Sequence, residues 1–208
     1  MSRGTGRSCE AWWVSVVLLV LTAGAGCATG PSLPKSADPH WIEISNVRLF
    51  LVSEEDDCGV AALTSVLTFW RPDLSLSEVR SEVQSEARRP MGPELPRQGV
   101  AAGTLRTVAL AHGVRAFLVK GTWDDLVHEI RSGRPVIIGL AEQHGSQRMG
   151  HYVVIAGINP VTRTLLVADP RGSWRRVEEP MLMTEWRPAN QLALVILPIP
   201  LLAGEGSE

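Results

Sequence analysis

"EEDDCGVAALTSVLTFW", residues 54–70, places a cysteine between four acidic residues and an apolar run. The apolar residues after Cys58 recur at helical spacing, which predicts a helix that begins near Cys58 with Asp57 as its N-cap. A cysteine at such a position is either a small packing residue or a nucleophile, because the partial positive charge of a helix N-terminus favours a thiolate. The four acids oppose a thiolate, and we expect most of them to face solvent, where screening weakens their effect.

Helical patterns come first along the chain and strand patterns second. Capping boxes at Ser75 with Glu78 and at Thr122 with Asp125 predict the starts of two further helices. The predicted strands are 114–119, 135–141, 151–158, 163–169 and 193–198, with a polar loop at 142–150. This order indicates an α+β domain in which N-terminal helices pack on an antiparallel β-sheet.

A histidine and an aspartate stand at the two open ends of one predicted hairpin. His151 begins a strand after a glycine-bearing loop, and Asp169 ends the next strand. Pairing around a turn at 159–162 would place them nearly opposite each other. An imidazole can stabilise a thiolate and protonate a leaving amine, and a carboxylate can orient the imidazole. We therefore predict a catalytic triad of Cys58, His151 and Asp169. The alternative is a packing cysteine, a hydrogen-bonded strand histidine and a turn-forming aspartate.

The composition limits the classes of function. The chain has 208 residues, of which 45% are apolar and 20% are charged, as expected for one globular domain with a core. Its net charge of −2 argues against a nucleic-acid partner. The five histidines show no metal-ligand spacing with Cys58, so we predict neither a metal site nor a cofactor.

The first residues are typical of a secretion signal. A positively charged start precedes an apolar run at 12–26, which ends in small residues directly before Cys27. Small residues before a cysteine resemble a bacterial lipobox, so we predict a signal peptide at 1–26 and lipidation of Cys27. Residues 27–40, rich in Pro, Ser, Ala and Gly, then form a lipidated tether. The alternative is an uncleaved signal anchor.

These assignments predict where the mature protein lies. Cleavage and lipidation leave Cys58 as the only free thiol, in a domain predicted at 41–200 with a disordered tail at 201–208. We expect a lipoprotein on the periplasmic face of a bacterial membrane. The outer membrane is preferred because Ala28, and not an aspartate, follows Cys27.

Three motifs in this order resemble a known family. "DDCGVAALTSVL" (56–67), "GHYVVIAGI" (150–158) and "VADPRG" (167–172) are similar to motifs of the bacteriocin-processing cysteine peptidases. These are papain-like leader peptidases that cut after a double glycine and are often fused to ABC exporters. The resemblance extends over roughly residues 41–198.

The resemblance implies a papain-like fold with Cys58 as nucleophile, His151 as base and Asp169 as the residue that orients the imidazole. It implies a thiol peptidase, or a related amide hydrolase, that cleaves peptides outside the cytoplasm. We expect a stand-alone relative whose partners are a peptide or protein substrate and, through Cys27, a bacterial membrane. Acyl transfer to an amine would use the same thioester and stays open.

One position departs from the family pattern. The family usually places a glutamine six residues before the cysteine to donate to the oxyanion, whereas this chain has Val52. Ser53, Gln98 and Gln143 are possible substitutes. The loss of one oxyanion donor costs about 100- to 1,000-fold in rate. The second hypothesis is therefore a catalytically impaired relative that binds a peptide or a partner protein in the cleft.

Overall fold

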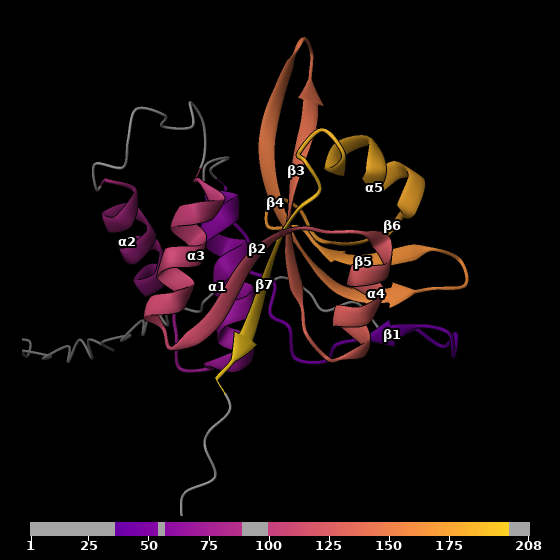
Figure 1. Ribbon diagram of the computed structural model, residues 1–208, viewed down its shortest axis with the longest axis horizontal. Helices are drawn as coiled ribbons and strands as arrows, with labels where there is room; N and C mark the ends of the chain where they lie inside the picture. Colours follow the sequence, from indigo (N-terminus) through magenta and orange to yellow (C-terminus); the bar gives the residue numbers. More distant parts are fainter. Residues whose placement is uncertain (1–35, 54–56, 89–99, 200–208) are drawn as a thin grey trace, which may run out of the picture.

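The computed structural model describes residues 36–53, 57–88 and 100–199. The predicted signal peptide, the Cys27 lipidation site and the predicted tail at 201–208 lie outside these residues. The helices are α1 (Cys58–Trp70), α2 (Leu76–Ala87), α3 (Ala102–Ala111), α4 (Trp123–Arg131) and α5 (Glu179–Trp186). The strands are β1 (Ile42–Glu43), β2 (Val114–Lys120), β3 (Val136–His144), β4 (Gln147–Asn159), β5 (Thr164–Ala168), β6 (Trp174–Glu178) and β7 (Leu192–Pro198). The first three helices precede an antiparallel sheet, which confirms the predicted α+β class (Figure 1).

The sheet is covered by helices on both faces. Its strand order is β2-β7-β3-β4-β5-β6, and β1 pairs with the end of β4. Ile137 and Val154 pack toward α1 and α3, whereas Ile138 and Val153 belong to a second core cluster with α4 and α5. Figure 1 shows the two groups of helices on opposite sides of the strands. Strands buried on both faces have near-continuous apolar sequences, which explains the pattern of β3.

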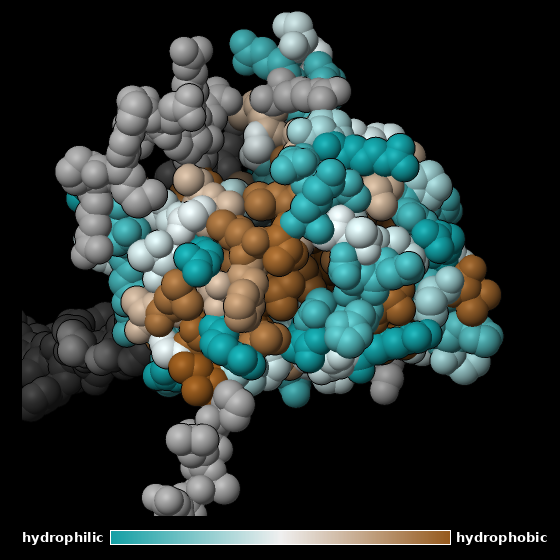
Figure 2. Space-filling view, viewed as in Figure 1, coloured by the Kyte–Doolittle hydropathy of each residue, from teal (hydrophilic) through white to brown (hydrophobic). Residues whose placement is uncertain are grey.

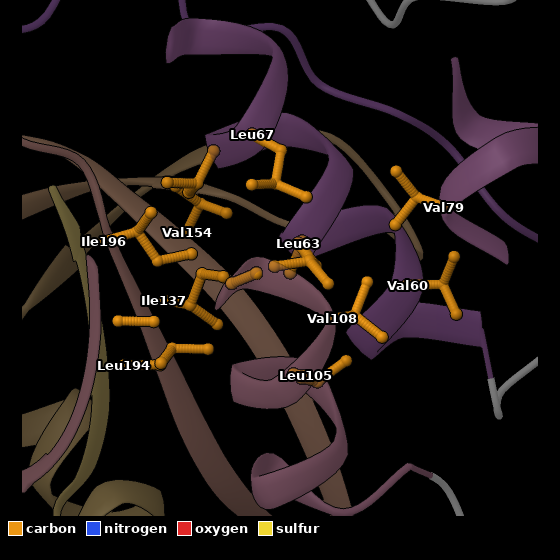
Figure 3. Packing of buried hydrophobic residues seen from close by; sticks show 14 of the residues in the cluster. Val60, Leu63, Leu67, Val79, Leu105, Val108, Ile137, Val154, Leu194 and Ile196 are labelled. Atoms are coloured by element: carbon orange, nitrogen blue, oxygen red, sulfur yellow. The ribbon is translucent and has the colours of Figure 1, made fainter. Parts of the chain in front are cut away.

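Helix α1 is the centre of the first core cluster. Leu63 and Leu67 lie beside Ile137 and Val154 of the sheet, and α2 and α3 cover the outer side of α1 (Figure 3). Even the polar residues of α1 are buried, because Thr64, Ser65 and Thr68 donate their hydroxyl groups to carbonyls four residues earlier at 2.8–2.9 Å. The helix therefore has no solvent face over most of its length.

The start of α1 differs from the prediction in one detail. The helix begins at Cys58 as expected, but the side chain of Asp57 makes no capping hydrogen bond. The backbone of Asp57 is already helical (φ −91°, ψ −4°), whereas a capping side chain requires an extended backbone. Its carboxylate instead lies 2.8 Å from Nη2 of Arg80 in α2, so it does not simply face solvent.

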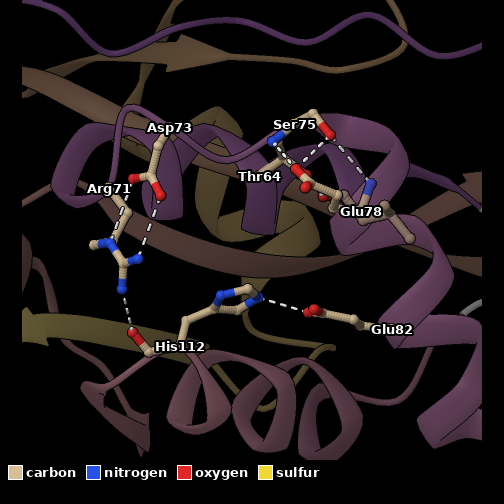
Figure 4. A network of polar contacts seen from close by, with 8 residues as sticks. Thr64, Arg71, Asp73, Ser75, Glu78, Glu82 and His112 are labelled. Carbon is tan, nitrogen blue, oxygen red and sulfur yellow. Dashed lines mark hydrogen bonds and ion pairs between the residues drawn. The ribbon is translucent and has the colours of Figure 1, made fainter.

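Polar contacts tie the ends of the first three helices together. The predicted capping box of Ser75 and Glu78 begins α2, and Arg71 donates from Nη1 to the carbonyl of His112 after α3 (Figure 4). The ring of His112 lies 2.6 Å from Oε2 of Glu82 in α2. The second predicted capping box, Thr122 with Asp125, begins α4.

The prediction of a polar loop at 142–150 is wrong. Strands β3 and β4 continue through it as one hairpin, in which His144 pairs with Gln147 and Gly145 has a positive φ of 60°. The hairpin projects from the body of the molecule (Figure 1), so most of its outer residues meet solvent and carry no apolar alternation. As a consequence, His151 lies within β4 and does not begin it.

The pairing of β4 with β5 is shifted from the predicted register. Ile155 pairs with Val167 and Ile158 with Leu165, with an irregularity between these pairs. Asp169 follows β5 and lies beyond the last pair. Strand β6 and helix α5, which follow Asp169, were not predicted, because both are short and their apolar residues lack a clear period.

An apolar hollow opens on the face shown in Figure 2. It has a volume of about 400 Å³ and lies between the edge strand β2, its neighbour β7 and helix α4 (Figure 2). Phe117 and Val119 of β2 are exposed there. None of the helices in the described ranges has the length and apolar character needed to span a membrane.

Candidate functional site

Cys58 is the first residue of α1, and its side chain is buried with 3% of the residue exposed. The first N–H groups of a helix lack intrahelical partners, so the backbone N–H of Cys58 is a potential donor to a developing negative charge. The next residue must be small, because a Cβ on Gly59 would lie 3.1 Å from Cδ2 of Tyr152 and 3.3 Å from Cδ1 of Leu105. The Cys-Gly pair thus allows the helix start to approach β4 closely.

The ring of His151 links α1 to the segment after β5. Its Nε2 lies 2.8 Å from Oδ1 of Asp169, and the residue is 1% exposed. Its Nδ1 is buried and has no hydrogen-bond partner, and the ring lines the same cleft as Cys58. The structure therefore brings the three predicted residues together.

The environment of the ring favours the imidazolium. Burial lowers the pKa of His151, but the hydrogen bond to Asp169 and the nearby Asp169 and Cys58 groups outweigh burial and raise this pKa to about 9. Burial likewise opposes ionisation of Asp169, yet the net pKa of this carboxyl is lowered by His151, by the N–H of Arg171 and by Arg175. At neutral pH, His151 is cationic and Asp169 anionic.

The segment after β5 is a hydrogen-bonded turn that fixes the Asp169 carboxylate. The Asp169 N–H donates to the carbonyl of Ser173, and the Arg171 N–H donates to Oδ1 of Asp169 at 3.1 Å. Nη2 of Arg175 lies 3.2 Å from Oδ2. The pairing of Ala168 with Val154 brings this turn to β4, and the turn itself holds Asp169 at His151. Asp169 therefore reaches His151 without being its partner in the strand register.

The described residues that were considered as oxyanion donors make other contacts or face solvent. Val52 is half-buried, and its N–H donates to the carbonyl of Pro170 at 2.9 Å. Ser53 is exposed, and Gln143 donates to the carbonyl of Gly145 within the hairpin turn. Gln98 lies outside the described residues. The backbone N–H of Cys58, at the start of α1, is a donor that this site can offer.

A narrow cleft adjoins Cys58 and His151. Its volume is about 280 Å³, and most of its lining residues are small or aliphatic: Val100, Ala101, Gly139, Leu140, Ala141, Gly150, Ala189 and Leu192. Tyr152 also lines the cleft, and its hydroxyl donates to the carbonyl of Val100 at 3.0 Å. Burial, followed by the charge of Cys58, raises the pKa of Tyr152 to about 12. The larger hollow beside β2 contains none of the three predicted residues.

Sequence reasoning missed three charged residues around the triad. Glu142 forms an ion pair with Arg171, and its Oε1 lies 3.9 Å from Nε2 of His151. Arg175 contacts Asp169. No local signal could have identified Glu142, because its position depends on strand β3 continuing through the predicted loop. Within the described ranges, no group of three or more His, Cys, Asp or Glu residues could hold a metal ion.

Solved structures identify the class of fold. The fold is similar to the peptidase domain of Streptococcus ComA, a bifunctional ABC transporter involved in quorum sensing, with a TM-score of 0.57 and 21% identity over 74% of this chain and 99% of that domain. A C39-like peptidase from Bacillus anthracis gives a TM-score of 0.58 and 16% identity over 76% of this chain and 98% of that one. A double glycine motif protease from an AMS/PCAT transporter gives a TM-score of 0.54 and 18% identity over 73% of this chain and 91% of that one. The protein thus has the papain-like cysteine peptidase fold.

The family follows from the sequence itself. Residues 44–194 match the model of the Peptidase_C39 like family, and the chain belongs to this family. No curated protein matched the sequence. Fold and family support a cysteine peptidase function, whereas the catalytic roles of Cys58, His151 and Asp169 stay predictions.

Proposed function

We propose that this protein is a thiol peptidase that hydrolyses peptides through Cys58, His151 and Asp169. The observation that carries the proposal is the buried His151 ring, which contacts Asp169 through Nε2 and lines the same cleft as Cys58. This arrangement can hold a thiolate and an imidazolium as an ion pair at the mouth of a cleft.

The proposed reaction proceeds in two stages. The Cys58 thiolate attacks the peptide carbonyl carbon, and the C–N bond breaks as the imidazolium of His151 protonates the leaving amine. The resulting thioester is then attacked by water, from which neutral His151 takes a proton. The C–S bond breaks, a carboxylic acid product leaves, and the thiolate–imidazolium pair is restored. Asp169 holds the ring in position throughout.

The cleft supports an extended peptide as substrate. Gly139, Ala141, Gly150 and Ala189 line it and add little side-chain bulk, so a peptide backbone can approach Cys58 closely. The similar AMS/PCAT protease was solved in complex with its leader peptide, which supports a peptide as the ligand of this cleft as well. Because that similar protein is a double glycine motif protease, we propose cleavage after a small residue, glycine or alanine, in an extended peptide.

A diverse peptide library tests this function. Wild-type protein should generate products that Cys58→Ala does not, and the residues before the cut should be small. Equal product sets from both proteins would reject hydrolysis by Cys58. Addition of an amine acceptor would reveal acyl transfer as an amide product.

The second candidate is a peptide-binding protein with impaired catalysis, favoured by Val52 in place of an oxyanion-donating side chain. It predicts that library peptides bind, as measured by calorimetry, and are recovered intact after prolonged incubation with wild-type protein. Recovery of cut peptides would exclude it.

We also propose that Cys27 carries a lipid that anchors the protein to the periplasmic face of the outer membrane. The support is the sequence pattern before Cys27. Cells expressing the wild type should incorporate labelled palmitate into the protein, and Cys27→Ser should not. Labelling of the Cys27→Ser variant would contradict the assignment.

A further inference from the structure

A second carboxylate lies beside the Nε2 atom of His151. Oε1 of Glu142 is 3.9 Å from this atom, whereas Oδ1 of Asp169 is 2.8 Å from it. Glu142 lies on β3 two residues beyond Leu140, the residue that pairs with His151. Alternate residues of a strand share a face, so Glu142 and His151 are diagonal cross-strand neighbours. Two carboxylates therefore converge on one ring nitrogen.

Each carboxylate has an arginine partner from the same turn. Arg171 forms an ion pair with Glu142 while its backbone N–H donates to Asp169, and Arg175 contacts the other oxygen of Asp169. The contact between Arg171 and Glu142 fastens the β3–β4 hairpin to the segment that carries Asp169. The charged groups around the ring are Cys58 from α1, Glu142 from β3, and Asp169, Arg171 and Arg175 from the segment after β5.

We propose that Glu142 is a positioning residue, a reserve acceptor for the Nε2 proton of His151. The proposal rests on the function proposed above, in which His151 serves Cys58. Glu142 needs to approach by about 1 Å to reach hydrogen-bond distance, and a change of side-chain rotamer can supply this movement. With Asp169 in place, Glu142 adds a negative charge at a distance where opposite charge favours the imidazolium.

A double substitution tests the role, with alkylation of Cys58 by iodoacetamide at pH 6 as the readout. Only the thiolate reacts, so the rate reports the ion pair with His151 even when no peptide substrate is known. Asp169→Ala should remain within about tenfold of the wild-type rate, because Glu142 takes over the ring nitrogen. The double variant, Asp169→Ala with Glu142→Gln, should react at least about tenfold more slowly than Asp169→Ala alone. This difference in rate corresponds to a shift of one pH unit in the alkylation profile. Glu142→Gln alone should change the rate less than about threefold, because Asp169 still accepts the proton.

Glu129 on α4 provides a matched control. Its ion pair with Arg134 is buried to a similar degree, with side chains 16% and 25% exposed, compared with 15% and 22% for Glu142 and Arg171. Glu129→Gln in the Asp169→Ala background should leave the alkylation rate unchanged. A general loss of stability would slow both double variants alike.

Two results would overturn the proposal, and they are distinguishable. Equal rates for Asp169→Ala and for its combination with Glu142→Gln would reject the role of Glu142 and leave the proposed function intact. A wild-type protein that reacts only like an ordinary thiol, near pH 8.5, would reject the ion pair and this role together. If circular dichroism shows that Asp169→Ala does not fold, Asp169→Asn provides a second background. The additional Glu142→Gln substitution is expected to slow alkylation in that background as well.

Discussion

Gly59 is the residue that allows Cys58 to approach the strand carrying His151. Its hydrogen faces the ring of Tyr152 and a methyl group of Leu105, where any larger side chain would press on buried atoms. Burial and contact of this kind cannot be read from one sequence. The position of Cys58 at the start of its helix could be predicted, whereas His151 was assigned to the right strand but to the wrong place on it. The reason for a glycine at position 59 could not be predicted.

Substitution of Gly59 tests this packing. Gly59→Ala should lower the free energy of unfolding by about 1–3 kcal/mol through overpacking, and should slow alkylation of Cys58 by shifting the helix start. Gly103→Ala is the matched control, because it is also helical and has nothing within 4 Å of the added Cβ. The free energy of unfolding of Gly103→Ala should equal that of the wild type or exceed it by up to about 1 kcal/mol. Chemical denaturation of both variants checks the prediction, and equal effects would contradict it.

At the scale of elements, α2 compensates a charge at the start of α1. Asp57 directly precedes Cys58 and opposes a thiolate there, but Arg80 of α2 pairs with it at 2.8 Å. The sequence predicts both helices and both capping boxes, because these depend on local spacing. The pairing of Asp57 with Arg80 depends on how α2 packs against α1, which no local pattern determines.

Removal of the arginine should expose the effect of that charge. Arg80→Met leaves the carboxylate of Asp57, whose side chain is largely buried, without this cation beside Cys58. The rate of Cys58 alkylation at pH 6 should fall by about three- to tenfold. Arg71→Met, which breaks the pair with Asp73 at the opposite end of α1, should leave the rate unchanged. A comparable loss in both variants would indicate a general weakening of the helices, against this account.

The β3–β4 hairpin shows where prediction of the elements fails. Its outer residues are polar and include Gly145, so residues 142–150 have the composition of a loop although they form strands. The same error hid Glu142, which lies on the extended part of β3. Backbone pairing between two strands can persist beyond the core without any apolar alternation to mark it.

For the whole molecule, the site lies where the two parts of the fold meet. Helix α1 supplies the thiol, and the sheet and its following turn supply the ring and the carboxylate (Figure 1). The order of helices and strands, and hence the α+β class, follows from the sequence. The cover of the second face by α4 together with α5 does not, because α5 is short and only two of its residues are buried.

The titration of His151 should be visible in global stability. Its pKa is about 9 in the folded protein and about 6.5 when unfolded, so its contribution is fully present below pH 6.5 and is lost as the pH rises toward 9. The free energy of unfolding should fall by on the order of 3 kcal/mol across this window. The lowered pKa of Asp169 acts in the opposite direction, so its contribution is present above about pH 4 and is lost in acid. Urea denaturation of wild type and His151→Ala at several pH values checks this prediction. The same change in unfolding free energy from pH 6.5 to 9 in both proteins would contradict it.

The pH dependence of Cys58 alkylation, measured on wild type and His151→Ala, tests the central claim most directly. A thiolate held by an imidazolium should react at mildly acidic pH in the wild type. In His151→Ala, half-maximal reaction should move up to the range of an ordinary thiol, about pH 8.5. Identical profiles for the two proteins would show that the ring does not act on the sulfur, and would contradict the triad on which the proposed peptidase depends.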